Sequence, residues 1–213
     1  MLTSRRSLLQ IGVMLIWLAG VGAPTFAETA DLLTALHEGS IWAEFHGTGE
    51  LGVDATIGRN AGGPNFVAIP PGTQFWAQAS GRQGQTTLGW VPIDLSRNAV
   101  ASLRIPTACT NINRRAPTPD DQLFPEPCPD DRMARLCAVL DPTRDDLNAI
   151  QIAVWAVANN PSLRTIGRHE DHLVPAEVTE PELRRQELQS LLDTAAALLQ
   201  KADLRPTSFR MFR

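Results

Sequence analysis

The sequence predicts an α+β protein in which an N-terminal antiparallel β-sandwich-like layer packs against C-terminal helices. Three segments predict this fold: a strand-like pattern over about 40–108, a proline-rich crossing segment over 109–129, and helical apolar spacing over 130–204. The chain of 213 residues is 43% hydrophobic and 20% charged, which is typical of globular proteins and excludes a disordered or fibrous chain. We therefore expect one domain over 28–204, followed by a loose tail over 205–213.

The strand-like part consists of short apolar runs separated by clusters of glycine, proline and asparagine. These runs are Ile41–Phe45, Val53–Ile57, Asn65–Ile69, Gln74–Ala77, Gly89–Ile93 and Ala99–Ile105. Short strands at such spacing, with turn residues between them, are typical of a sandwich or a barrel. Pro70 and Pro71 lack the N–H that a strand ladder needs, so we expect a turn or a sheet edge there.

Three helices follow from the apolar spacing in the C-terminal part. The first covers Asp131–Leu140, and the second covers Arg144–Ala158 with Thr143 as its N-cap. The second helix is apolar on nearly all sides after Leu147, so we expect it to be buried. A Thr-Glu-Pro-Glu capping box over 179–182 predicts the start of a third, amphipathic helix that continues to about residue 202.

Residues 1–27 have the three-part pattern of an export signal. Arg5 and Arg6 provide the positive start, residues 11–22 are apolar, and small residues surround a cleavage point before Glu28. The apolar run is too short to cross a hydrocarbon layer of roughly 30 Å as a helix. We therefore expect a cleaved leader and a periplasmic or secreted protein; an uncleaved anchor in the membrane interface is the alternative.

The segment Ser-Arg-Arg-Ser-Leu-Leu-Gln over 4–10 resembles the twin-arginine export signal of bacteria, with Leu8 where phenylalanine is commoner. This resemblance implies that the protein crosses the membrane already folded. Ordinary secretory signals can also carry paired arginines, so the general secretory route is the alternative. Either route ends outside the cytoplasm.

The charge balance excludes two classes of partner. The chain has 19 basic and 23 acidic residues, and removal of the leader with Arg5 and Arg6 leaves 17 basic residues against the same 23. Nucleic acids and anionic lipid surfaces both require a basic face, which this composition does not favour. No later apolar stretch is long enough to suggest a membrane span after the leader is removed.

Three cysteines, Cys109, Cys128 and Cys137, leave at least one thiol without an intramolecular disulfide partner. Cys128 and Cys137 form the candidate disulfide, because they lie about ten residues apart across the start of the first helix. Pairing of Cys109 with either of the others is an alternative. The remaining possibility is that all three are small buried residues that stay reduced.

Gln151 is unusual because it lies inside an otherwise apolar helix. A buried amide must find hydrogen-bond partners, and Trp155, four residues later, shares its face of the helix. One interpretation is a core amide that ties the helix to a strand edge, with Cys109 as a packed core thiol.

The other interpretation comes from a resemblance. Ile150–Trp155 has the pattern apolar-Gln-x-Ala-apolar-Trp, and it follows a Cys-x-Asn at Cys109 and an Arg-x-Pro-x-Pro at Arg115. These motifs resemble the thioester domains of bacterial surface proteins, in which a β-sandwich cysteine and a helical glutamine are joined. The resemblance implies Cys109 as the thiol, Gln151 as the acyl donor, and Trp155 packed beside them. Ala108 differs from the family, where an aromatic residue is usual.

His169 and His172 form the candidate metal pair, because their spacing would place both imidazoles on one face of a helix. A divalent site needs a third ligand, for which His46 or Glu44 is the candidate. The nearby Gly167 and Pro175 favour the alternative, a solvated polar loop.

These patterns predict an exported, non-enzymatic binding or interaction protein that needs no cofactor and has an unknown protein or small-molecule partner. An internal Cys–Gln thioester would let it capture amines covalently. The alternatives are a periplasmic metal-binding accessory protein and a hydrolase whose site follows no familiar motif. Neither Gly-x-Ser-x-Gly nor His-Glu-x-x-His occurs in the sequence.

Overall fold

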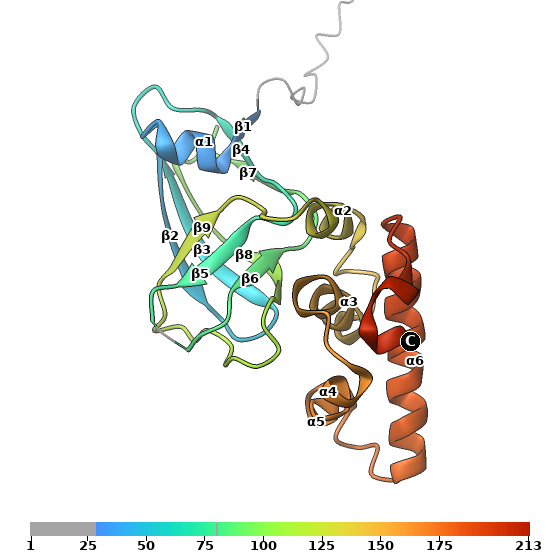
Figure 1. Cartoon of the computed structure of the whole chain (residues 1–213). Coiled ribbons are helices and arrows are strands. Elements are labelled where there is room, and N and C mark those ends of the chain that lie inside the picture. The colour runs from blue at the N-terminus through green and yellow to red at the C-terminus, as the bar shows by residue number, and fades with distance from the viewer. Residues whose placement is uncertain (1–28, 80) are drawn as a thin grey trace, which may run out of the picture.

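The computed structural model describes residues 29–79 and 81–213, so the expected leader over 1–27 lies outside the described residues. Figure 1 shows a β-rich N-terminal part beside a helical C-terminal part, which confirms the predicted α+β class. Within the described ranges, no helix is long and apolar enough to cross a membrane.

The larger sheet has six strands and is nearly closed into a barrel. Its order is β2 (Ile41–Gly47), β3 (Gly52–Arg59), β8 (Val100–Cys109), β6 (Gln85–Thr87), β5 (Gln74–Ala77) and β9 (Leu123–Glu126). Neighbouring strands are antiparallel throughout. A β-bridge between His46 and Gln122 brings the chain just before β9 back to β2. This one bridge brings the two end strands of the sheet together at a single point, so the sheet is nearly closed.

The smaller sheet has three strands, in the order β1 (Thr29–Asp31), β4 (Phe66–Ile69) and β7 (Val91–Asp94). β1 runs parallel to β4, so the strand layer is not antiparallel throughout. Helix α1 (Leu32–His37) follows β1 directly and starts at Asp31, whose side chain accepts from the N–H of Thr34.

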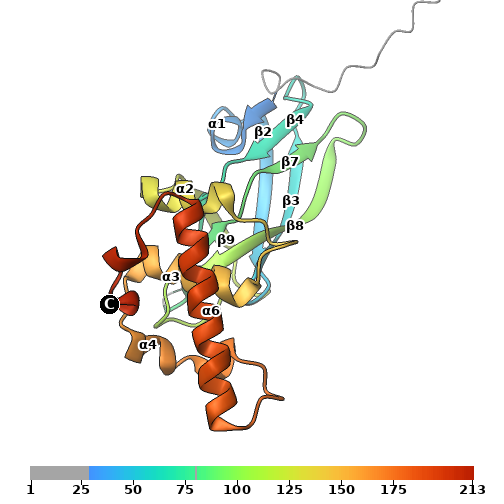
Figure 2. The ribbon, with the colours of Figure 1, turned by 90° about the vertical axis from the view of Figure 1, so that its right-hand side faces the viewer.

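The C-terminal part contains α2 (Asp131–Val139), α3 (Leu147–Asn159), α4 (Leu163–Gly167), α5 (Glu170–Leu173) and α6 (Pro181–Lys201). Two short 3-10 turns, η2 (Pro206–Ser208) and η3 (Arg210–Phe212), follow them. Figure 1 shows α3 between the barrel and α6, and Figure 2 shows α6 along the length of this part. Every α3 residue over 149–157 is buried, which confirms the burial predicted from its apolar composition.

The described apolar residues form two core clusters, one inside the β-rich part and one among the helices. Phe45 and Phe75 meet in the first cluster, with ring centroids 5.0 Å apart. Strand β8 contributes to both, because Ile105 belongs to the barrel cluster and Ala108 to the helical cluster. Its final residues therefore lie where the two parts meet.

The predicted N-terminal caps of two helices are wrong. The N-cap of α3 is Asp146, whose carboxylate accepts from the N–H groups of Asn148 and Ala149. Thr143 is bound instead to the Asp141 carboxylate in the preceding turn. The expected capping box is also absent: α6 begins at Pro181, its N-cap residue is Glu180, and no side chain makes a cap bond there. Proline suits this first position because its missing N–H would have no partner inside the helix.

Sequence patterning also missed order in three places. The 205–213 tail is not loose, because the side chains of Phe209 and Met211 are buried against the helical core. His172 lies in the short helix α5, with His169 as its N-cap residue, and not in a loop. The proline-rich crossing segment contains β9, where Pro125 is tolerated because β9 pairs with a strand on one side only over most of its length.

Candidate functional site

The side-chain amide of Gln151 is bound to the main chain of Cys109. The Gln151 Oε1 atom accepts from the Cys109 N–H at 2.9 Å, and Gln151 Nε2 donates to the Cys109 carbonyl oxygen at 2.7 Å. Gln151 is only 3% exposed and Cys109 is fully buried. The structure thus brings together the two residues that the sequence singled out, although they lie 42 positions apart.

The end of β8 explains why an amide can bind there. Regular pairing between β8 and β3 ends at Pro106, three residues before Cys109. The N–H and C=O groups of Cys109 therefore lack a strand partner on that side, and a buried main-chain group without a partner costs free energy. The Gln151 amide, with one donor and one acceptor, takes the place of that strand. These two bonds tie α3 to the barrel, as the core-amide interpretation requires.

The same two bonds fix the position of the amide carbon. Because the amide spans the N–H and C=O of one residue, its carbon faces the Cα atom of Cys109, two bonds from the thiol sulfur. The thiol itself donates to the carbonyl oxygen of Glu50 at 3.4 Å. The thiol and the amide are therefore neighbours through the Cys109 main chain, and the thiol is held by a different partner from the amide.

Burial raises the pKa of the Cys109 thiol to about 12, and the nearby charge of Glu50 acts in the same direction. A hydrogen bond with Gln85 opposes this shift. The thiol is therefore protonated at neutral pH, and a reagent from solution meets neither a thiolate nor an exposed sulfur.

A cavity of about 280 Å³ lies next to this contact. It is lined by Glu50, Gln83, Ile112, Arg114, Arg115, Ala116, Trp155, His169 and His172. Glu50 connects it to the thiol, and Trp155 connects it to Gln151, one helical turn away. The rings of Trp155 and His169 are 5.8 Å apart between centroids, so aromatic groups form one wall. The indole N–H of Trp155 is buried and has no hydrogen-bond partner among the described residues.

The ring centroids of His169 and His172, the candidate metal pair, are 6.3 Å apart. The described residues contain no group of three His, Cys, Asp or Glu side chains that could hold an ion, so the metal site stays a prediction. His46 and Glu44, the expected third ligands, lie on β2. Burial, with the neighbouring His172 and Arg168, lowers the pKa of His169, so its imidazole is neutral at pH 7.

The candidate disulfide is not formed in this structure, which describes all three cysteines as free thiols. The Cys137 sulfur is fully buried and lies 3.7 Å from the Thr86 hydroxyl, while Cys128 donates to the carbonyl oxygen of Asp130. The Cys128 sulfur also lies close to Gly72, where an added Cβ would be 2.7 Å away. The pairing of Cys128 with Cys137 therefore stays a prediction.

Sequence reasoning did not find Glu50 and Gln85 as neighbours of Cys109, or Arg114 as a residue of the adjacent cavity. Each lies in a turn or a short strand, and none stands in a pattern that marks a site. Closure of the barrel brings them together, and spacing along the chain gives no sign of it. No family model, curated protein or solved structure matches this chain.

Proposed function

We propose that this chain is an exported, non-enzymatic binding protein that captures an amine-bearing partner through an internal thioester between Cys109 and Gln151. The observation that supports the proposal is the double hydrogen bond between the Gln151 amide and the Cys109 main chain. It holds a weak acyl donor beside a buried thiol, and groups held in contact in this way have a very high effective concentration for one another.

Formation of the thioester is balanced without an oxidant or a cofactor. The Cys109 sulfur attacks the Gln151 amide carbon, the carbon–nitrogen bond breaks, and ammonia leaves with the thiol proton. Negative charge develops on Oε1 during the attack, and the Cys109 N–H already donates to that atom at 2.9 Å. A donor that is fixed before charge develops stabilises the transition state with little reorganisation.

Capture of the partner reverses the role of the sulfur. An amine nitrogen attacks the thioester carbon, an amide bond forms, the carbon–sulfur bond breaks, and Cys109 regains a proton as a thiol. The pKa of this thiol, about 12 in its buried setting, favours that proton return. The 280 Å³ cavity provides the approach, and the neutral imidazole of His169 on its wall can accept the proton that the amine loses.

The mass of the intact, mature protein tests the proposal directly. Loss of ammonia lowers the mass by about 17 Da, and methylamine then adds to Gln151 and frees one thiol. Cys109→Ala removes both effects, whereas Cys128→Ala, a matched change at a second thiol, leaves them. If the mature protein has the full mass of its sequence and does not incorporate methylamine, the thioester proposal is contradicted. Gln151 would then act only as a core amide that ties α3 to the barrel. The same spectrum reports whether the chain begins near Glu28, as an exported protein should.

A further inference from the structure

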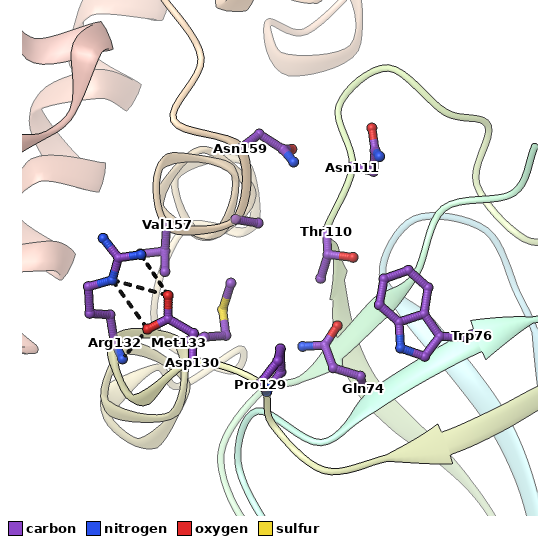
Figure 3. A pocket seen from close by; sticks show the side chains of 11 residues that line it. Gln74, Trp76, Thr110, Asn111, Pro129, Asp130, Arg132, Met133, Val157 and Asn159 are labelled. Atoms are coloured by element: carbon purple, nitrogen blue, oxygen red, sulfur yellow. Dashed lines mark hydrogen bonds and ion pairs between the residues drawn. The ribbon is translucent and has the colours of Figure 1, made fainter.

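A second cavity, of about 440 Å³, lies between the barrel, α2 and the end of α3 (Figure 3). Gln74 and Trp76 line it from β5, and Met133 and Val157 line it from the helices. It shares no lining residue with the cavity beside Trp155 and His169. A volume of this size suits a small ligand of one or two ring units.

Three amide side chains of this cavity each use one of their two polar atoms in a hydrogen bond, while the other polar atom has no partner among the described residues. Gln74 donates Nε2 to the Gly72 carbonyl oxygen, which leaves its Oε1 as an acceptor. The Oδ1 atoms of Asn111 and Asn159 accept from main-chain N–H groups, which leaves each Nδ2 as a donor. Figure 3 shows the two asparagines at one end of the cavity and Gln74 nearer the other.

The hydroxyl of Thr110 does not open into the cavity. It is buried, makes no hydrogen bond to any described residue, and lies on the Gly84 side of the Trp76 ring, where an added Cβ on Gly84 would be 3.0 Å away. Figure 3 shows it turned toward Trp76. The polar groups that the cavity offers to a ligand are therefore the two amide donors and the one amide acceptor.

The cavity carries no net charge that would select an ion. Its two charged lining residues, Asp130 and Arg132, form an ion pair of 2.6 Å with each other. This pairing lowers the pKa of the Asp130 carboxyl, so the pair stays ionised and internally neutral at ordinary pH. The free groups are therefore matched to uncharged hydroxyl and carbonyl groups of a ligand.

Trp76 adds an aromatic surface to this set. Its side chain is 36% exposed, and Gly84 packs so closely against the ring that an added Cβ would lie 2.7 Å from a ring carbon. The contact with Gly84 holds one side of the indole in place, while Trp76 also lines the cavity. An exposed indole next to neutral amide groups can stack on the C–H face of a sugar ring while the amides bind its hydroxyls.

We propose that this cavity binds a neutral sugar of one or two rings, independently of the Cys109–Gln151 contact. The proposal rests on the combination of the exposed indole of Trp76 with the amide atoms of Asn111, Asn159 and Gln74 that line the cavity.

Saturation-transfer NMR on the full mature chain tests it with four neutral disaccharides: maltose, cellobiose, lactose and N,N′-diacetylchitobiose. Glucuronic acid and tetraglycine serve as a charged probe and a peptide probe. We expect transfer to at least one disaccharide and to neither of the other two.

Variants locate the binding. Trp76→Ala should abolish transfer, and Trp42→Ala is its matched control, because Trp42 is 40% exposed and also packs against a glycine, on β2. Asn111→Ala removes one free donor and only one local bond, to the N–H of Asn113, so it should weaken binding by about tenfold without unfolding the protein.

The proposal is overturned if no disaccharide shows transfer, or if the glucuronic acid or the peptide binds in its place. It is equally overturned if Asn111→Ala binds the sugar as tightly as the unaltered protein does. The Asn111 result decides the matter even where Trp76→Ala fails to fold.

Discussion

The side chain of Asn160 accepts a hydrogen bond from the main-chain N–H of Arg210 at 2.7 Å, and so joins the end of α3 to the C-terminal turns. Asn160 also ends α3 in the left-handed conformation, with φ of 46°. One residue thus terminates the buried helix and fixes the tail that covers its core. Two variants of Asn160 can therefore measure the contribution of the hydrogen bond and that of the left-handed conformation separately.

Asn160→Gly should cost about 1 kcal/mol of unfolding free energy, because glycine adopts the left-handed conformation but lacks the side-chain acceptor. Asn160→Ala should cost about 2 kcal/mol, because it loses the bond and adds backbone strain. Urea denaturation measures both values. Equal stability of the two variants would show that the left-handed conformation is not retained in solution.

Gln151→Leu in a Cys109→Ala background should lower the unfolding free energy by about 2 kcal/mol or more, because two buried main-chain groups of residue 109 lose their partner. The Cys109→Ala background removes any thioester, so the loss reports the hydrogen bonds alone. Urea denaturation of the single and double variants gives the difference.

Gln151→Glu in that same background should be pH-dependent. A carboxylate oxygen would face the carbonyl of residue 109, so the buried acid must keep its proton. Since this raises the pKa of the acid in the folded state, stability should fall as the pH rises from acid towards neutral. A flat profile between these pH values would place residue 151 in contact with water.

Burial raises the pKa of the Cys137 thiol from 9.0 to about 12. The folded protein then holds a proton that the unfolded chain releases, so stability is full below pH 9 and declines above it. The slope should approach about 1.4 kcal/mol per pH unit for this thiol. Urea denaturation at several pH values checks it, and Cys137→Ala should flatten the decline. Cys128→Ala, at a less buried thiol, should flatten it less.

Gly58→Ala should destabilise the protein by about 1–3 kcal/mol, because an added Cβ would lie 2.1 Å from the Trp42 ring on the neighbouring strand. Gly167→Ala is the control, since an added Cβ there meets nothing within 4 Å. Its effect should be neutral or mildly stabilising. Thermal unfolding of both variants measures the contrast, and equal midpoints would contradict the close packing of Trp42.

The sequence predicted those parts of the fold that depend on local pattern. The strand at Gln74–Ala77 and the helix from Asp131 follow from apolar spacing, and their observed bounds agree within a residue. The start of α3 was misplaced because Thr143 is a residue type that suits an N-cap, but its side chain is already bound to Asp141 two residues earlier. Asp146, three residues later, caps the helix instead.

In the candidate site, too, the sequence predicted one part and missed another. Gln151 could be predicted as a bound side chain from the sequence alone, because an amide inside an apolar helix needs hydrogen-bond partners in any fold. Its partners turned out to be main-chain atoms of Cys109, and side-chain patterns carry no information about free main-chain groups. Gln85 and Glu50 reach the thiol only because β6 pairs with β8 and the turn before β3 folds over that strand end.

Strand β8 contributes side chains to both core clusters, and the Gln151 amide is hydrogen-bonded to the main chain of its last residue, Cys109. A covalent bond at this point would close a ring between positions 42 apart in the chain. Such a ring lowers the conformational entropy of the unfolded chain, and for this length it would stabilise the folded state by about 4 kcal/mol. Capture of an amine would cut that ring open. The partner would then remain attached to α3, while the barrel and the helices would be held together by packing and by hydrogen bonds such as that from the Gly89 N–H to the Cys137 carbonyl oxygen.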